Sequence, residues 1–98
     1  MKVVAVGGKA FVTGFVLAGV KGEYVDTPEA ALAKVNELVR QPEVGLIMVS
    51  DEVARPIKAE LMAVRAKRAV PLIYELPGPG SKMEKVEYRA MLRAILGV

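Results

Sequence analysis

Three short runs of apolar residues set the strongest constraint on how this chain can fold. They are Val3 to Val6, Val44 to Val49 and, apart from Glu75, Val70 to Leu76. A strand that is apolar at consecutive positions, and not only at alternate ones, is buried on both faces of its sheet. A sheet buried on both faces needs helices on both sides. The runs therefore predict an α/β protein.

Helical patterns separate the apolar runs. Residues 10–19 form a nearly all-apolar helix, with Gly14 inside it and Gly19 able to end it. A helix that is apolar nearly all round must be covered on more than one side. The sheet covers one side, and we expect the terminal helix or a partner to cover another. Gly14 and Gly19 would permit that neighbour a close approach.

The two later helices have clearer start signals. Thr27-Pro28-Glu29 supplies an N-cap, a proline at the first helical position and an acid in the first turn, and Pro42 stops this helix. Ser50 or Asp51 can cap the next helix, which runs to about Arg68. Pro56 should kink or restart it, because proline lacks an N–H and collides with the preceding turn.

The order of these elements predicts the topology. Glu23-Tyr24-Val25 is a short, polar strand that suits a sheet edge. Alternating strands and helices imply parallel pairing through right-handed crossovers. We predict a three-layer α/β sandwich with a four-stranded parallel sheet in the order 2-1-3-4, of Rossmann-like or receiver-like topology, plus a C-terminal helix. The predicted division is an α/β domain at 1–76, a Pro/Gly hinge at 77–80 and the C-terminal helix at 81–98.

The C-terminal helix carries the most distinctive surface. Ser81 and Glu84 form a capping box, and apolar residues spread over roughly two thirds of the helix circumference. A helix lying on its own sheet needs a stripe of only about 100° or somewhat more. We expect one part of this helix to pack on its own domain and another part on a second protein. The alternative is a generously apolar terminal helix in a small domain.

Composition narrows the classes of function. The 98 residues suit one domain, and the chain contains neither cysteine nor histidine. These absences remove thiolate chemistry and the side chain best suited to proton transfer near neutral pH. No apolar run reaches the ~20 residues that span a bilayer, and no signal-peptide pattern precedes the first strand. We therefore expect no membrane insertion and no secretion.

The net charge of +3 is modest for a protein that binds nucleic acid. The densest basic group is Arg65, Lys67 and Arg68, at a predicted helix C-terminus where positive charge offsets the helix dipole. Nucleic-acid binding usually needs a longer basic stripe with stacking aromatics. We expect no nucleic-acid partner.

A ligand in such a sheet would lie where the strand order reverses, near Gly7-Gly8 and residues 50–52. The glycines match neither dinucleotide-binding nor phosphate-loop spacing. Asp51 invites comparison with response-regulator receivers, but the acidic pair that would complete a Mg²⁺ site is absent after the first strand. We interpret Asp51 as a helix cap. No catalytic, cofactor or metal site is predicted.

At this point the sequence resembles the F subunits of the archaeal-type and vacuolar-type rotary ATPases. The segments that carry the resemblance are VVAVGG (3–8), TGFVLAGV (13–20), DTPEAA (26–31), VGLIMVSDEVA (44–54), VPLIYELPGPGS (70–81) and RAILGV (93–98). They cover almost the whole chain in family order, and Gly14 to Gly19 is the most specific. The chain departs from the family at Gly8, where an acid is common, and at Pro56 inside a helix.

The resemblance implies a non-catalytic rotor component of a proton- or sodium-translocating ATP synthase or ATPase. In that family the domain sits beside the coiled-coil D subunit of the central stalk, and the C-terminal helix extends toward the catalytic A and B subunits. It implies a cytoplasmic location, peripheral to the membrane. The expected partner contacts are Val86, Met91, Leu92 and Ile95, with Lys85, Arg89 and Arg93 meeting acidic groups. The alternative is a free-standing receiver-like or nucleotide-sensing regulatory domain.

Overall fold

The fold is an open parallel sheet with helices on both faces, seen in a computed structural model that describes residues 2–77, 90 and 93–94. The elements in chain order are β1 (Lys2–Gly7), α1 (Lys9–Leu17), β2 (Lys21–Tyr24), α2 (Pro28–Leu38), β3 (Val44–Ser50), α3 (Asp51–Ala54), a 3₁₀ turn (Arg55–Ile57), α4 (Lys58–Lys67) and β4 (Leu72–Leu76). Most of the predicted helix at 81–98 lies outside the described residues. Ala90, Arg93 and Ala94 are helical and exposed.

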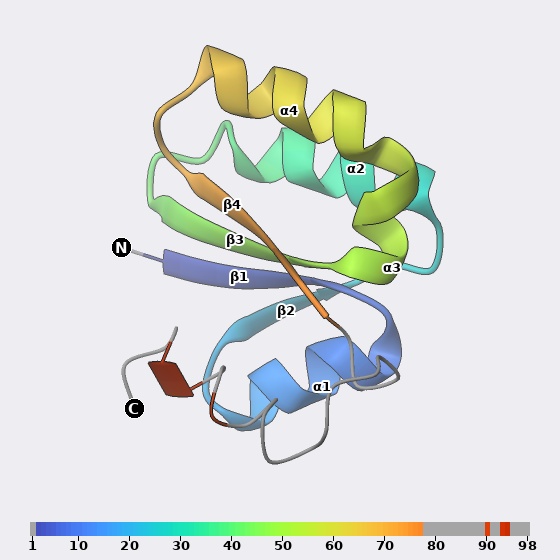
Figure 1. Cartoon of the computed structure of the whole chain (residues 1–98). Helices are drawn as coiled ribbons and strands as arrows, with labels where there is room; N and C mark the ends of the chain where they lie inside the picture. The colour runs from blue at the N-terminus through green and yellow to red at the C-terminus, as the bar shows by residue number, and fades with distance from the viewer. Residues whose placement is uncertain (1, 78–89, 91–92, 95–98) are drawn as a thin grey trace.

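The sheet has the predicted topology. The strand order is β2-β1-β3-β4, and every neighbouring pair is parallel. Helices α2 and α4 cover one face and α1 lies on the other (Figure 1). This arrangement confirms the three-layer α/β sandwich.

Two hydrophobic cores fill the layers. The larger core lies under α2, α3 and α4 and takes Val4, Ile47 and Leu61, all with no exposed surface. The smaller core lies under α1 and takes Phe15 and Met48. Alternate residues of β1 and β3 enter opposite cores. This explains why these strands are apolar at consecutive positions.

Several predicted boundaries shift in the structure. The second strand is Lys21–Tyr24 and not residues 23–25, because its ladder with β1 begins at Val4↔Lys21. The fourth strand begins at Leu72 and not at Val70, since Pro71 has no N–H to give a ladder. The first helix is Lys9–Leu17, and Gly19 follows it with a φ of 89°, a left-handed conformation that favours glycine.

The predicted helix starts and breaks agree with the structure better than the strand boundaries do. Thr27 caps α2 as predicted, its Oγ1 accepting a hydrogen bond from the Ala30 N–H at 3.1 Å. Pro56 lies in the 3₁₀ turn that separates α3 from α4, so the chain restarts there. The interpretation of Asp51 as a cap is wrong. Ser50 holds the N-cap position, and Asp51 is the first helical residue, paired with Arg55 at 3.5 Å.

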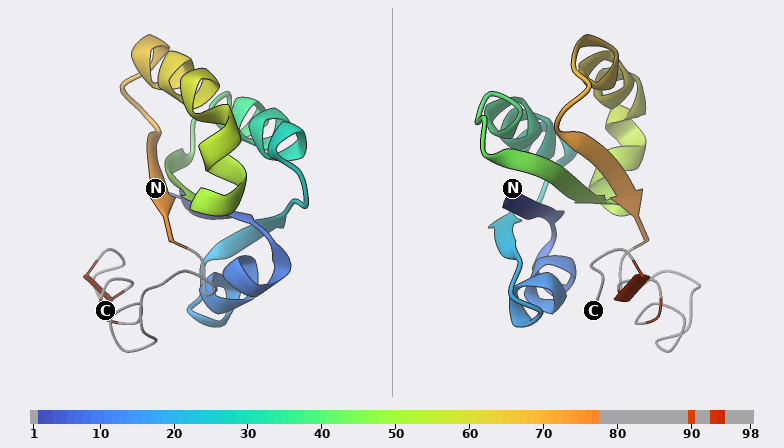
Figure 2. Two further views of the ribbon diagram at one scale, coloured as in Figure 1. Left: turned by 45° about the vertical axis from the view of Figure 1, so that its right-hand side comes forward. Right: turned by 90° about the vertical axis from the view of Figure 1, so that its left-hand side faces the viewer.

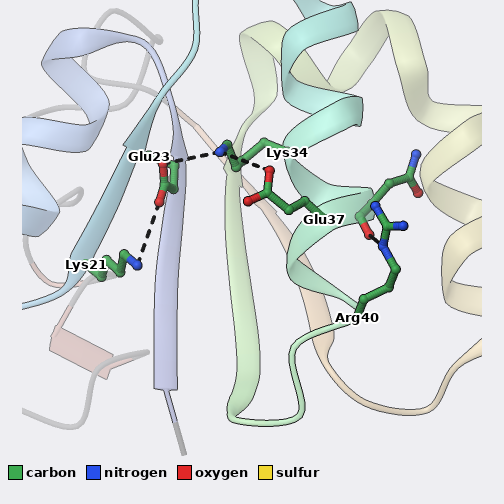
Figure 3. Close-up of polar contacts among 6 residues, drawn as sticks. Lys21, Glu23, Lys34, Glu37 and Arg40 are labelled. Carbon is green, nitrogen blue, oxygen red and sulfur yellow. Dashed lines mark hydrogen bonds and ion pairs between the residues drawn. The ribbon is translucent and has the colours of Figure 1, made fainter.

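Edge strand β2 is held to its neighbours by two devices. A Cβ added to Gly22 would meet Val12 Cγ1 and lie 2.8 Å from Val16 Cγ2, so α1 packs closely on a strand position without a side chain. On the other face, Lys34 of α2 lies between Glu23 of β2, at 3.7 Å, and Glu37, at 3.2 Å (Figure 3). The ammonium group therefore connects α2 to the edge of the sheet.

Candidate functional site

The carboxyl edge of the sheet carries no assembled chemistry in the described residues. Gly7 packs tightly, since an added Cβ would lie 2.7 Å from the Phe11 ring and 2.8 Å from Ser50 Cβ. Ser50 is 2% exposed. The Asp51 carboxylate pairs with Arg55 of the 3₁₀ turn that follows α3. Gly7 therefore serves a tight turn from strand to helix.

A pocket of about 390 Å³ lies beside this edge, between α1 and β2. It is lined by Lys9, Val12, Thr13 and Tyr24. Among the described residues, this lining offers an ammonium and two hydroxyls, but no carboxylate or imidazole to act as a general base near neutral pH. Within residues 2–77, 90 and 93–94, no group of three or more Asp, Glu, His or Cys side chains could hold a metal ion.

The α1 side of the sheet has an open face over parts of strands β1, β3 and β4. The open face consists of Val3, Leu46, Leu72 and Tyr74. The ladder pairs Leu46 with Leu72 and Met48 with Tyr74, and Leu72 and Tyr74 are 56% and 51% exposed. Apolar side chains at this exposure, adjoining a core, mark a surface suited to another protein segment.

Helix α1 presents further apolar side chains beside its buried residues. Val16 is 51% exposed and Leu17 is 83% exposed. The prediction that this helix needs a cover on more than one side is consistent with these exposures. Apart from chain neighbours and the backbone of α1 itself, no described residue lies within 4 Å of a Cβ added at Gly14 or Gly19. The expected neighbour at these glycines, the terminal helix or a partner, lies outside the described residues.

The partner contacts predicted from the sequence belong to the terminal helix. Arg93 is helical and exposed. The other six predicted contacts lie outside the described residues: Lys85, Val86, Arg89, Met91, Leu92 and Ile95. The open face was missed, because Leu72 and Tyr74 belong to an apolar strand whose burial the sequence predicts on both faces.

The fold and its surfaces define a class of protein: a small parallel α/β domain with exposed apolar side chains among its described residues. No helix in the described part of the chain is long and apolar enough to cross a membrane. A family model described as the ATP synthase (F/14-kDa) subunit matches residues 3–93. The chain belongs to this family.

Relatives from archaea support the same assignment. The chain is 34% identical to the F subunit of the A-type ATP synthase of Thermococcus kodakarensis, over all of this chain and 96% of the relative. It is 31% identical to the F subunit of the A-type ATP synthase of Methanocaldococcus jannaschii, over all of this chain and 97% of the relative. Identity to the corresponding protein of Methanothermobacter thermautotrophicus is 30%, over 98% of this chain and 92% of the relative.

Proposed function

We propose that this protein is a non-catalytic central-stalk subunit of an ion-translocating A-type ATP synthase. The observation that carries the proposal is the family match over residues 3–93, joined by relatives named as F subunits that align along nearly their full length. The proposed role is to bind the coiled-coil D subunit and to couple or regulate rotary ATP synthesis or hydrolysis. The proposed location is the cytoplasmic side of the membrane, as part of the complex.

The proposed partner surface is the terminal helix. Its apolar residues Val86, Met91, Leu92 and Ile95 would supply most of the affinity for the D subunit. The basic residues Lys85, Arg89 and Arg93 would set orientation and association rate against acidic groups. The catalytic A and B subunits are further proposed partners of this helix.

The open face supports a two-sided role for that helix. Strand β4 ends at Leu76, whose side chain enters the core under α1 and so lies on the same side of the sheet as the open face. We propose that one side of the terminal helix covers Leu72 and Tyr74, while its other side meets the D subunit. Covering these side chains would remove apolar surface from water. The favourable free energy of this burial is roughly 25 cal/mol per Å².

Co-expression with the D subunit of the same organism tests the proposal. The full chain carrying Met91→Ser and Leu92→Ser should lose the D subunit on size-exclusion chromatography, whereas Met62→Ser should retain it. Met62 is a suitable control because it is an apolar residue, 58% exposed, on α4. A chain truncated before Ser81 should still unfold cooperatively and should lose the D subunit. If the truncated chain bound the D subunit as tightly as the full chain, the terminal helix would not be the partner surface.

A further inference from the structure

A groove runs between the carboxyl-terminal halves of α2 and α4, on the sheet face opposite the open face. The two helices lie side by side in both views of Figure 2. The groove has a volume of about 350 Å³. Its apolar lining comes from Val39, Ala63 and Val64, of which Val39 is buried and Val64 is half-buried.

Three cations surround this apolar lining. Arg40 lies two residues after the end of α2, Lys67 is the last residue of α4, and Arg68 follows it. None of the three pairs with a carboxylate within the described part of the chain, although four other cations there do. Of the described residues that line the groove, none is acidic. The groove is therefore a cationic surface with an apolar centre.

Hydrogen bonds hold two of these cations in place. The Arg68 guanidinium donates from Nη1 to the Val39 carbonyl oxygen at 3.0 Å, and so joins the end of α4 to the end of α2. Arg40 donates from Nε to the Asn36 carbonyl oxygen at 3.1 Å. Each guanidinium keeps further N–H donors that these bonds do not use, in the planar fork that suits a carboxylate.

The charge of the groove disfavours the chain's own tail as its occupant. Residues 81–98 contain four cationic side chains, Lys82, Lys85, Arg89 and Arg93, against two acidic ones, Glu84 and Glu87. Like charges brought together at an interface oppose binding. The occupant must instead combine carboxylates with an apolar stripe. The lining also lacks the aromatic side chains on which nucleic-acid bases stack.

We propose that the α2–α4 groove binds an acidic amphipathic helix of another protein. Apolar residues of that helix would lie on Val39 and Val64, and its carboxylates would meet Arg40, Lys67 and Arg68, as in other helix-in-groove interfaces. The site goes beyond the proposed role of the terminal helix. It lies on the other face of the sheet, so either proposal can fail while the other stands.

A designed peptide pair tests the groove on the full chain. The first peptide has about 18 residues, with leucines at three- and four-residue spacing and glutamates at most other positions. The matched peptide has lysine at each glutamate. In ¹⁵N NMR titrations, the glutamate peptide should bind saturably and shift the amide signals of Val39, Ala63, Val64 and Lys67. The lysine peptide should not shift them.

Charge reversal sharpens the test. Arg40→Glu with Lys67→Glu should weaken the glutamate peptide at least about tenfold and allow the lysine peptide to bind. Lys9→Glu with Lys58→Glu makes the same change in net charge away from the groove, and should change the affinity less than about twofold. Circular dichroism of each variant checks that it is folded.

Other outcomes would overturn the proposal. These are the absence of saturable binding of the glutamate peptide, shifts centred on Leu72 and Tyr74, or an equal loss of binding in the control variant. Two further results would assign a different occupant. One is a dimer in light scattering that Lys67→Glu abolishes, and the other is a DNA duplex that binds more tightly than the peptide at the same salt concentration.

Discussion

Arg65 of α4 donates two hydrogen bonds to the carbonyl oxygen of Ile73 in β4, from Nε at 3.2 Å and from Nη2 at 2.9 Å. The same guanidinium lies 3.7 Å from the Glu75 carboxylate. Strand β4 is at the edge of the sheet, where backbone groups lack a neighbouring strand. Arg65 therefore satisfies an edge carbonyl and fastens the helix to the strand.

The first prediction concerns this contact. Arg65→Ala should lower the free energy of unfolding by about 1–2 kcal/mol, since hydrogen bonds from a charged donor are lost. Urea unfolding followed by circular dichroism measures the change. Lys58→Ala, an exposed change at the other end of α4, is the control and should have little effect. If the free energy of unfolding fell no more than in the control, water would satisfy the Ile73 carbonyl as well as Arg65 does.

The second prediction concerns the seat of α1 on β2. Gly22→Ala should destabilise the protein by about 1–3 kcal/mol, because the new methyl group would collide with Val12 and Val16. Gly14→Ala is the matched control: no described residue lies within 4 Å of its added Cβ. In helix α1 that change should stabilise the fold by up to about 1 kcal/mol. In thermal unfolding, Gly22→Ala should lower the midpoint temperature and Gly14→Ala should raise it. A shift in the same direction for both variants would contradict the close packing of α1 on Gly22.

The third prediction concerns the start of α2. Thr27→Ala removes the acceptor for the Ala30 N–H and should cost about 1 kcal/mol. Thr27→Asn keeps a capping oxygen and should be close to the native protein in stability. Thr13→Ala, at an exposed position of α1, controls for loss of a hydroxyl. If Thr27→Asn proved as unstable as Thr27→Ala, the capping bond would not explain the effect.

The fourth prediction is a pH dependence. The hydrogen bond that Lys34 donates to Glu37, together with the charge of Glu23, raises the pKa of Lys34 above its usual 10.5. A raised pKa in the folded state means that the stabilisation is complete below the unfolded-state pKa and is lost as pH rises through the folded-state value. The stability difference between the native protein and Lys34→Met should therefore hold at about pH 8 and shrink above about pH 10.5.

Urea unfolding at several pH values measures that difference. Lys9→Met serves as a control, because Lys9 forms no ion pair in the described residues. Its difference from the native protein should vary less over the same range. A Lys34→Met difference that is constant from about pH 8 to about pH 11 would contradict the role of the two carboxylates.

Local signals in the sequence predicted much of the fold. Thr27 and Pro28 indicate a helix start through residues that are neighbours in sequence, and Pro56 interrupts the helix because it falls past the first turn, where its missing N–H and its ring cannot be accommodated. The order of the strands was predicted from parallel right-handed crossovers and from the short, polar strand at Glu23-Tyr24-Val25. Such features depend on neighbours in sequence, so a single chain displays them.

The surfaces were harder to predict because they depend on contacts between distant residues. Arg65, Lys67 and Arg68 form one basic group in the sequence, yet Arg65 turns to β4 while Arg68 reaches a carbonyl 29 positions away. Gly22 lacks a side chain, so no hydropathy pattern could indicate that α1 packs on it. The partner contacts of the terminal helix stay a prediction.

The exit of the chain from β4 has a mechanical consequence. Five registered pairs join β4 to β3, from Leu46↔Leu72 to Ser50↔Leu76, and the last side chain of the strand is 4% exposed. A force applied to Pro77 along the axis of β4 would load the hydrogen bonds between β3 and β4 together, in shear. It would not break them one after another from one end. A partner that pulls on the chain in this direction is therefore resisted by the full β3–β4 ladder.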